Sequence, residues 1–189
     1  MKILYIHGYG STGNAMKAQK LQMMFPDWEI VAPTFDYDRL SPKVIYDQLK
    51  SIIGKEQPQA ILGSSTGGYY ALCCMRFYQG IVWCVNPVSD ILKTIKLLAN
   101  SNPSIPQGPI VQKIQEYALF DQEVFQRAQS RNGQLHLALS IDDELLGDHH
   151  CLLDRYPNCA KVVWKEDCGH RFYKFDELKV DIAQSLGAE

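Results

Sequence analysis

The sequence predicts an α/β fold in three layers, α/β/α, with helices on both faces of a mostly parallel, six-stranded sheet. Two observations support this prediction. Short apolar stretches alternate along the chain with segments in which apolar residues recur at helical spacing. The first apolar stretch, residues 2–7 (KILYIH), also lacks the polar–apolar alternation of a strand with one exposed face. It is therefore typical of a parallel strand that is buried on both faces.

The predicted strands are residues 2–7, 28–32, 58–62, 81–85, 135–140 and 161–164. A helix is expected over residues 14–25. Ser41 followed by Pro42 is typical of a helix start, with serine as the N-cap and proline in the first turn. Further helices are expected from Tyr69, near Asp148, and as one continuous helix at the C-terminal end, which stops at Gly187.

The alternation of strands and helices is interrupted between residues 88 and 133. Two helical segments, 89–99 and 110–129, flank a stretch that contains prolines. This connection is too long for a simple crossover, so we interpret 88–133 as a helical cap or insert within a single domain that spans residues 1–189. An elongated crossover helix without contact to a substrate is the alternative. The apolar side chains of this segment are enough to form one modest pocket.

The composition is that of an ordinary soluble globular protein, with 46% hydrophobic and 21% charged residues. A formal net charge of −2 gives no reason to expect nucleic acid or an anionic membrane as a partner. No apolar run approaches the roughly 18 residues of a membrane span. The apolar start of the chain is too short for a signal peptide and lacks a small-residue cleavage site. We therefore expect a cytoplasmic protein.

The six cysteines do not suggest a disulfide framework. Cys73 and Cys74, for example, are adjacent in a predicted helix, as expected for small buried hydrophobic residues in a reducing compartment. Residues 148–151 (DHHC) match a motif of membrane palmitoyl transferases, but the cysteine-rich zinc frame of those enzymes is absent. We interpret this run as the polar start of a helix, with His149 and His150 at the surface. No metal and no cofactor are expected.

The most informative stretch is residues 60–69 (AILGSSTGGY), where a predicted buried strand gives way to a helix. Gly63-Ser64-Ser65-Thr66-Gly67 fits the pattern G-x-S-x-G, with Ser65 at its centre. A nucleophilic serine on a strand-to-helix turn has a strained backbone, and side chains two positions away would collide, which explains both glycines. A phosphate-binding loop would also require glycines, but the Gly-Lys-Ser/Thr ending of such a loop is absent.

Polar side chains follow four of the predicted strands directly. Residues 7–9 follow the first strand, Ser65 the third, residues 142–144 (DDE) the fifth and residues 168–170 (CGH) the sixth. Carboxyl ends of parallel strands meet at one edge of a sheet, where α/β proteins place their binding sites. We therefore expect these groups to form one site.

Each of these groups has a role in acyl transfer. Ser65 is a weak nucleophile unless a base takes its proton, and His170 can take that proton near neutral pH and return it to the leaving group. A carboxylate would hold the imidazole in the correct tautomer and stabilise the imidazolium. The residues alone leave Asp142 and Asp143 as nearly equal candidates for this carboxylate.

The oxyanion of an acyl-transfer intermediate needs two donors that are already in place. The Thr66 N–H at the start of the helix is one, and the Tyr9 N–H in the loop after the first strand is the natural second. In the same loop, His7 is expected to be a structural hydrogen-bonding residue rather than a second base. His136, inside the fifth predicted strand, is expected to be structural.

The order serine, acid, histidine is that of α/β-hydrolases, and the chain closely resembles the small bacterial esterases described as YqiA-like. The matching stretches are residues 5–9 (YIHGY), 63–70 (GSSTGGYY), 85–87 (VNP), 142–146 (DDELL) and 168–172 (CGHRF). The resemblance spans nearly the whole chain but is weak from 88 to 133. It implies an α/β-hydrolase-like sheet with the strand order 2-1-3-4-5-6. It also implies an esterase triad of Ser65, Asp143 and His170, because the family pattern places its acid just before the Glu-Leu-Leu run.

We therefore expect a serine hydrolase that cleaves carboxylic esters through a Ser-His-Asp triad and an acyl-enzyme intermediate. Its partner would be a small-molecule ester with a short-to-medium acyl chain. An acyltransferase with the same triad and a non-catalytic member of the fold that binds a ligand or partner are the alternatives. The sequence does not indicate an oligomeric state.

Overall fold

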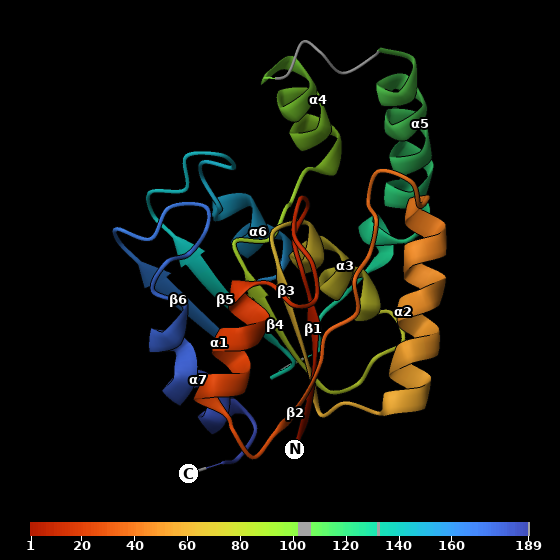
Figure 1. Cartoon of the computed structure of the whole chain (residues 1–189). Coiled ribbons are helices and arrows are strands. Elements are labelled where there is room, and N and C mark those ends of the chain that lie inside the picture. The colour runs from red at the N-terminus through yellow and green to blue at the C-terminus, as the bar shows by residue number, and fades with distance from the viewer. Residues whose placement is uncertain (102–106, 132, 189) are drawn as a thin grey trace.

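The structure, a computed structural model, describes residues 1–101, 107–131 and 133–188 (Figure 1). Within these residues the strands of the single sheet are β1 (Lys2–Ile6), β2 (Glu29–Val31), β3 (Ala60–Ser64), β4 (Ile81–Val85), β5 (Leu135–Ser140) and β6 (Lys161–Lys165). They lie in the order β2-β1-β3-β4-β5-β6, and every neighbouring pair is parallel. The predicted fold class and strand order are confirmed.

The helices agree with the prediction in position and differ at some ends. They are α1 (Met16–Met24), α2 (Pro42–Glu56), α3 (Thr66–Cys74), α4 (Ile91–Ser101), α5 (Gln107–Glu123), α6 (His150–Arg155) and α7 (Lys179–Ser185), with short 3₁₀ helices η1 (Phe125–Arg127) and η2 (Phe175–Leu178). As predicted, α2 begins after Ser41, whose hydroxyl accepts a hydrogen bond from the Val44 N–H. The continuous C-terminal helix that was predicted is instead divided into η2 and α7.

Two separate hydrophobic cores lie on the two faces of the sheet, because successive side chains of a strand point to opposite faces. Leu4 and Ile6 of β1 belong to the core beneath α2 and α3, whereas Ile3 and Tyr5 belong to the core beneath α1 and α7. Both faces of the central strands are thus covered. This explains why these strands read as nearly continuous apolar runs in the sequence.

Helix α3 begins at Thr66, three residues earlier than its apolar pattern indicates. The pattern misses the first turn because two of its residues are glycines, which have no side chain to contribute to it. Both glycines are required by close packing. A Cβ at Gly67 would lie 2.0 Å from the Ile6 carbonyl oxygen, and a Cβ at Gly68 would lie 2.7 Å from Pro87 Cβ. Helix α3 therefore packs more closely against β1 and the turn after β4 than it could with a side chain at positions 67 and 68.

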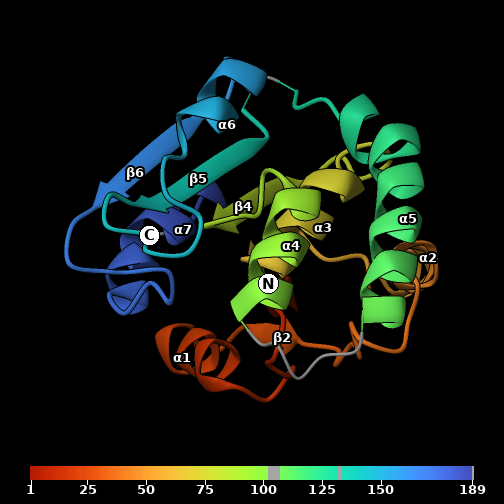
Figure 2. The same ribbon diagram turned by 90° about the horizontal axis from the view of Figure 1, so that it is seen from above.

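Helices α4 and α5 stand above the carboxyl ends of the strands (Figure 1). Seen from above, α4 lies over α3 and α5 lies beside α2 (Figure 2). These two helices and η1 come from the segment predicted as a cap, and residues 102–106 and 132 of that segment lie outside the described residues. Among the described residues, no helix combines the length and the apolar character that crossing a membrane requires.

Candidate active site

Ser65 lies at the sharp turn between β3 and α3, in a backbone conformation that few residues other than glycine adopt. Its φ of 54° and ψ of −120° place it in the strained region expected for a nucleophile elbow. The Ser65 N–H donates to the Val85 carbonyl at 3.0 Å, and the Ser65 carbonyl accepts from the Val88 N–H at 3.2 Å. A Cβ at Gly63 would lie only 2.3 Å from the Gly67 carbonyl oxygen. The glycines are therefore needed for the turn itself.

The structure brings Ser65, His170 and Asp143 into one hydrogen-bonded chain. His170 Nε2 lies 2.9 Å from Ser65 Oγ, and His170 Nδ1 lies 3.1 and 3.0 Å from the two carboxylate oxygens of Asp143. Because an ionised carboxylate only accepts hydrogen bonds, Nδ1 carries the proton and Nε2 is free to accept from the serine hydroxyl. The Asp143 side chain is fully buried, and the His170 side chain is 14% exposed.

The Asp143 carboxylate remains ionised despite its burial. Burial raises the pKa of a carboxyl group, but here hydrogen bonds from two imidazoles and from the Leu146 N–H outweigh that effect and hold the pKa of Asp143 below its usual range. The folded state therefore keeps a buried negative charge directly behind His170. Such a charge is suited to stabilising an imidazolium.

The three consecutive acids 142–144 all contact the loop that carries His170, each in a different way. Asp142 accepts from the Cys168 N–H at 3.1 Å and the Gly169 N–H at 3.2 Å, and Glu144 accepts from the His170 N–H at 2.7 Å. Only Asp143 reaches the imidazole ring. Of the two aspartates that the residues alone left nearly equal, Asp143 is the one that lies beside the ring of His170.

Asn86, which the sequence analysis assigned no role, holds the same loop from the other side. Its side-chain amide donates to the carbonyls of Gly169 and His170, both at 3.1 Å, and its side-chain oxygen accepts from the Ser140 N–H at 2.7 Å. Asn86 is fully buried and has a φ of 41°. The sequence signal for Asn86 was its place in the stretch 85–87, at the end of a predicted strand, which matches the family that the chain resembles.

The loop after β1 lies directly against the elbow. A Cβ at Gly8 would lie 3.1 Å from Ser65 Cβ. His7 is fully buried: its Nε2 accepts from the Phe35 N–H at 2.9 Å, so its Nδ1 carries the proton and donates to the Gly8 carbonyl at 2.8 Å. Burial lowers the pKa of His7, which favours this neutral form. Both ring nitrogens are occupied, and the predicted structural role of His7 is confirmed.

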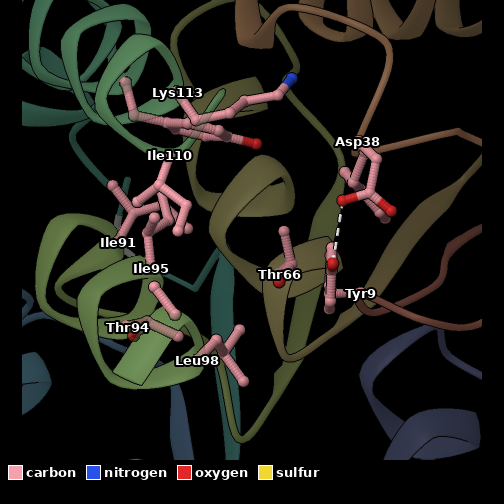
Figure 3. A pocket seen from close by; sticks show the side chains of 12 residues that line it. Tyr9, Asp38, Thr66, Ile91, Thr94, Ile95, Leu98, Ile110 and Lys113 are labelled. Carbon is pink, nitrogen blue, oxygen red and sulfur yellow. Dashed lines mark hydrogen bonds between the residues drawn. The ribbon is translucent and has the colours of Figure 1, made fainter. Parts of the chain in front are cut away.

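Tyr9 and Thr66, the predicted oxyanion donors, both line a cavity of about 410 Å³ beside the elbow (Figure 3). The Tyr9 hydroxyl donates to Asp38 at 2.8 Å, which fixes the side chain of this loop residue. Most of the opposite wall is apolar and comes from α4 and α5, which contribute Ile91, Ile95, Leu98, Ile110 and Tyr117. The cavity thus runs from Tyr9 and Thr66 to the helices of the segment 88–133.

The remaining histidines differ in their surroundings. His150 is exposed, as predicted, and His136 is buried within β5, where it stacks on Trp83. His149 was predicted to lie at the surface, and this was wrong: its side chain is 1% exposed and its Nε2 lies 3.1 Å from Asp143 Oδ2. The sequence offered no signal for this contact, because it depends on the path of the loop between β5 and α6.

All six cysteines are free thiols. Cys73, Cys74, Cys84 and Cys168 are buried, Cys159 is half-buried and Cys151 is exposed. As predicted, the polar run 148–151 leads into a helix, since α6 begins at His150. Within the described ranges, no group of three or more histidine, cysteine or acidic side chains is arranged to hold a metal ion.

Comparison with known proteins extends this description. A profile of the uncharacterised protein family UPF0227 matches residues 2–184. A UPF0227 protein of Vibrio vulnificus is 26% identical over 184 residues, which cover 93% of each chain. One from Shewanella sediminis is 24% identical over 179 residues, or 90% of each chain.

Solved structures with the same fold include Est1E from Butyrivibrio proteoclasticus, with a TM-score of 0.73 and 14% identity over 98% of this chain and 88% of that one. A monoacylglycerol lipase of Paleococcus ferrophilus has a TM-score of 0.69 and 12% identity over 98% and 93% of the two chains. At such low identities these likenesses establish the fold alone, and they confirm the predicted α/β-hydrolase fold.

Proposed function

The chain belongs to the UPF0227 family, and we propose that it is a serine esterase that cleaves carboxylic esters through Ser65, His170 and Asp143. One observation carries this proposal: the unbroken hydrogen-bonded chain from Ser65 Oγ through both nitrogens of His170 to the buried Asp143 carboxylate. A serine in a structural turn needs neither the strained backbone nor a histidine poised to take its proton.

In the acylation step, Ser65 Oγ attacks the carbonyl carbon of the ester while His170 Nε2 takes the hydroxyl proton. The negative charge that develops on the carbonyl oxygen is bound by the N–H groups of Thr66 and Tyr9. Neither of these N–H groups donates to another described residue. His170 then gives its proton to the departing alcohol oxygen, and the acyl group remains on Ser65.

In the deacylation step, a water molecule replaces the alcohol. His170 Nε2 takes a proton from the water, whose oxygen attacks the acyl carbonyl carbon, and the same two N–H groups bind the second oxyanion. Collapse of this intermediate breaks the bond to Ser65 Oγ, which recovers its proton from His170. Asp143 remains ionised throughout, because its role is to orient the ring and to stabilise the imidazolium.

The cavity supports a preference for short-to-medium acyl chains. Its volume of about 410 Å³ is near the lower end of the range for small-molecule sites. Its wall from α4 and α5 is mostly aliphatic, although Thr94, Lys113 and Tyr117 also line it, and it suits an uncharged hydrocarbon group. We accordingly assign the segment 88–133 the role of a cap that forms the acyl pocket of a single-domain enzyme.

The test is a series of p-nitrophenyl esters from acetate to palmitate, each assayed below its micelle concentration. We expect kcat/KM to reach its maximum at a short or medium chain and to fall for palmitate. A maximum at palmitate would contradict the assigned pocket, and no cleavage of any ester would contradict the esterase. Product analysis with added alcohols measures transfer to an acceptor, and we expect hydrolysis to predominate.

A further inference from the structure

The Asp143 carboxylate has more hydrogen-bond donors than the triad requires. The Leu145 N–H at 3.0 Å and the Leu146 N–H at 2.8 Å both donate to Oδ1. His170 Nδ1 lies within 3.1 Å of both oxygens, and His149 Nε2 lies 3.1 Å from Oδ2. Backbone groups thus hold one oxygen, whereas the contacts of the other within the described part of the chain come from two imidazoles alone. The position of Oδ2 therefore depends on His149.

The path of the chain after β5 places His149 on this oxygen. The Gly147 N–H donates to the Asp143 carbonyl at 2.9 Å, and Gly147 has a φ of 71°, which reverses the chain. The Leu152 N–H donates to the His149 carbonyl at 3.0 Å and fixes the start of α6. Asp148 accepts from the His150 N–H at 2.8 Å at the surface of the same turn. His149 consequently points inward and His150 outward.

Burial determines how His149 and Asp143 interact. Both side chains are almost completely enclosed, at 1% exposure for His149 and 0% for Asp143. Since an ionised carboxylate cannot donate, His149 must carry a proton on Nε2. A hydrogen bond to a buried charge contributes more than one between neutral groups, and solvent cannot replace it.

We propose that His149 is a positioning residue, which donates from Nε2 to Asp143 Oδ2 and so holds the carboxylate plane that orients His170. This inference rests on the proposed esterase function. Without the His149 donor, the backbone groups still hold Oδ1, but Oδ2 is held by His170 alone. The plane of the carboxylate is then less restrained, and the Nδ1–H of His170 loses one of its two fixed acceptors. The His170 tautomer and the direction of Nε2 toward Ser65 then become less defined. The loss falls on the chemical step, because His149 does not line the cavity.

The kinetic test uses matched variants. We expect His149→Ala to lower kcat by roughly 10- to 100-fold, the range of a lost hydrogen bond to a charged group, with KM changed less than about twofold. His149→Gln, whose side-chain amide nitrogen can reach the position of Nε2, should retain most of the activity. His149→Asn is too short and should behave like alanine. His150→Ala is the control on the exposed neighbour and should match the unaltered enzyme.

These variants distinguish a positioning role of His149 from a role in the stability of the fold. If His149→Ala does not fold, the contrast between the glutamine and asparagine variants decides the question, since both are polar and differ in reach. Equal kcat for these two, or an alanine variant with the kcat of the unaltered enzyme, would overturn the proposal. A rise in KM without a fall in kcat would also overturn it.

A second readout does not depend on turnover. In nitrogen-15 NMR spectra, His149 should appear as the tautomer protonated on Nε2, and the His170 Nδ1–H signal should broaden through solvent exchange in His149→Ala but not in His150→Ala. A His149 ring protonated only on Nδ1, or an unchanged His170 signal, would overturn the proposal. If the unaltered protein cleaves no ester, the proposed function fails on that result, and the NMR arm still decides the role of His149.

Discussion

The two sides of the candidate active site are held in place by different interactions. On one side, the loop of His170 is held by directional hydrogen bonds, which Asn86 donates and which Asp142 and Glu144 accept. On the other side, α4 and α5 present mostly aliphatic side chains to the cavity. Hydrogen bonds hold only over a narrow range of distance and angle, whereas apolar packing accepts side chains of similar volume. Under the proposed function, chemistry and substrate choice would therefore reside in separable parts of the chain.

The largest expected effect tests the hydrogen-bonded side of the site, which carries Ser65 and His170 and is called the polar side below. Ser65→Ala should lower kcat by about 10⁴-fold or more, with KM for a short ester nearly unchanged, because the nucleophile is lost while the cavity is intact. Steady-state kinetics on p-nitrophenyl acetate measures the loss, and the melting temperature serves as the control for folding. Turnover near that of the unaltered enzyme would assign the chemistry to another residue.

A second effect distinguishes two neighbouring acids on the polar side. Asp143→Asn should lower kcat by about 10³- to 10⁴-fold, because an amide in place of the carboxylate no longer enforces the Nδ1–H tautomer of His170. Asp142→Asn should lower kcat by less than about 10-fold, since it weakens contacts to the backbone of the loop and to the Ser140 hydroxyl but none to the ring of His170. The same ester assay measures both variants. The reverse ranking would mean that the ring of His170 turns to Asp142 in solution.

The smallest effect tests the apolar side of the site, which is formed by α4 and α5. Leu98→Trp places a larger ring in the cavity, and we expect it to lower kcat/KM for an octanoate ester by about 10-fold while changing the acetate ester by less than about threefold. Lys96→Trp, on the exposed face of the same helix, is the matched control. Equal losses on both esters in Leu98→Trp would show that the two sides of the site are not separable.

The parts of the fold that sequence analysis predicted well are those fixed by local patterns. Apolar runs located all the strands, and the glycines around Ser65 located the elbow, because a side chain at Gly63 or Gly67 cannot be accommodated. The start of α3 was placed too late, since Gly67 and Gly68 have low helix propensity and the helix includes them only because tertiary packing requires it.

The parts that the residues alone left open or that were predicted wrongly depend on how loops are folded. Asp142 and Asp143 are chemically identical and adjacent, so only their register at the end of β5 decides which one reaches His170. His149 and His150 form a similar pair, and the turn at Gly147 buries the first and exposes the second. Each of these choices rests on contacts between loops that are distant in the sequence.

Labelling by a fluorophosphonate probe, followed by peptide mapping, tests the central claim most directly, because the probe reacts only with a serine whose proton can be removed. We predict one adduct per chain, on Ser65, no adduct in Ser65→Ala, and much slower labelling in Asp143→Asn. An unaltered protein that cleaves esters without an adduct on Ser65, or that is labelled at another residue, would contradict the account.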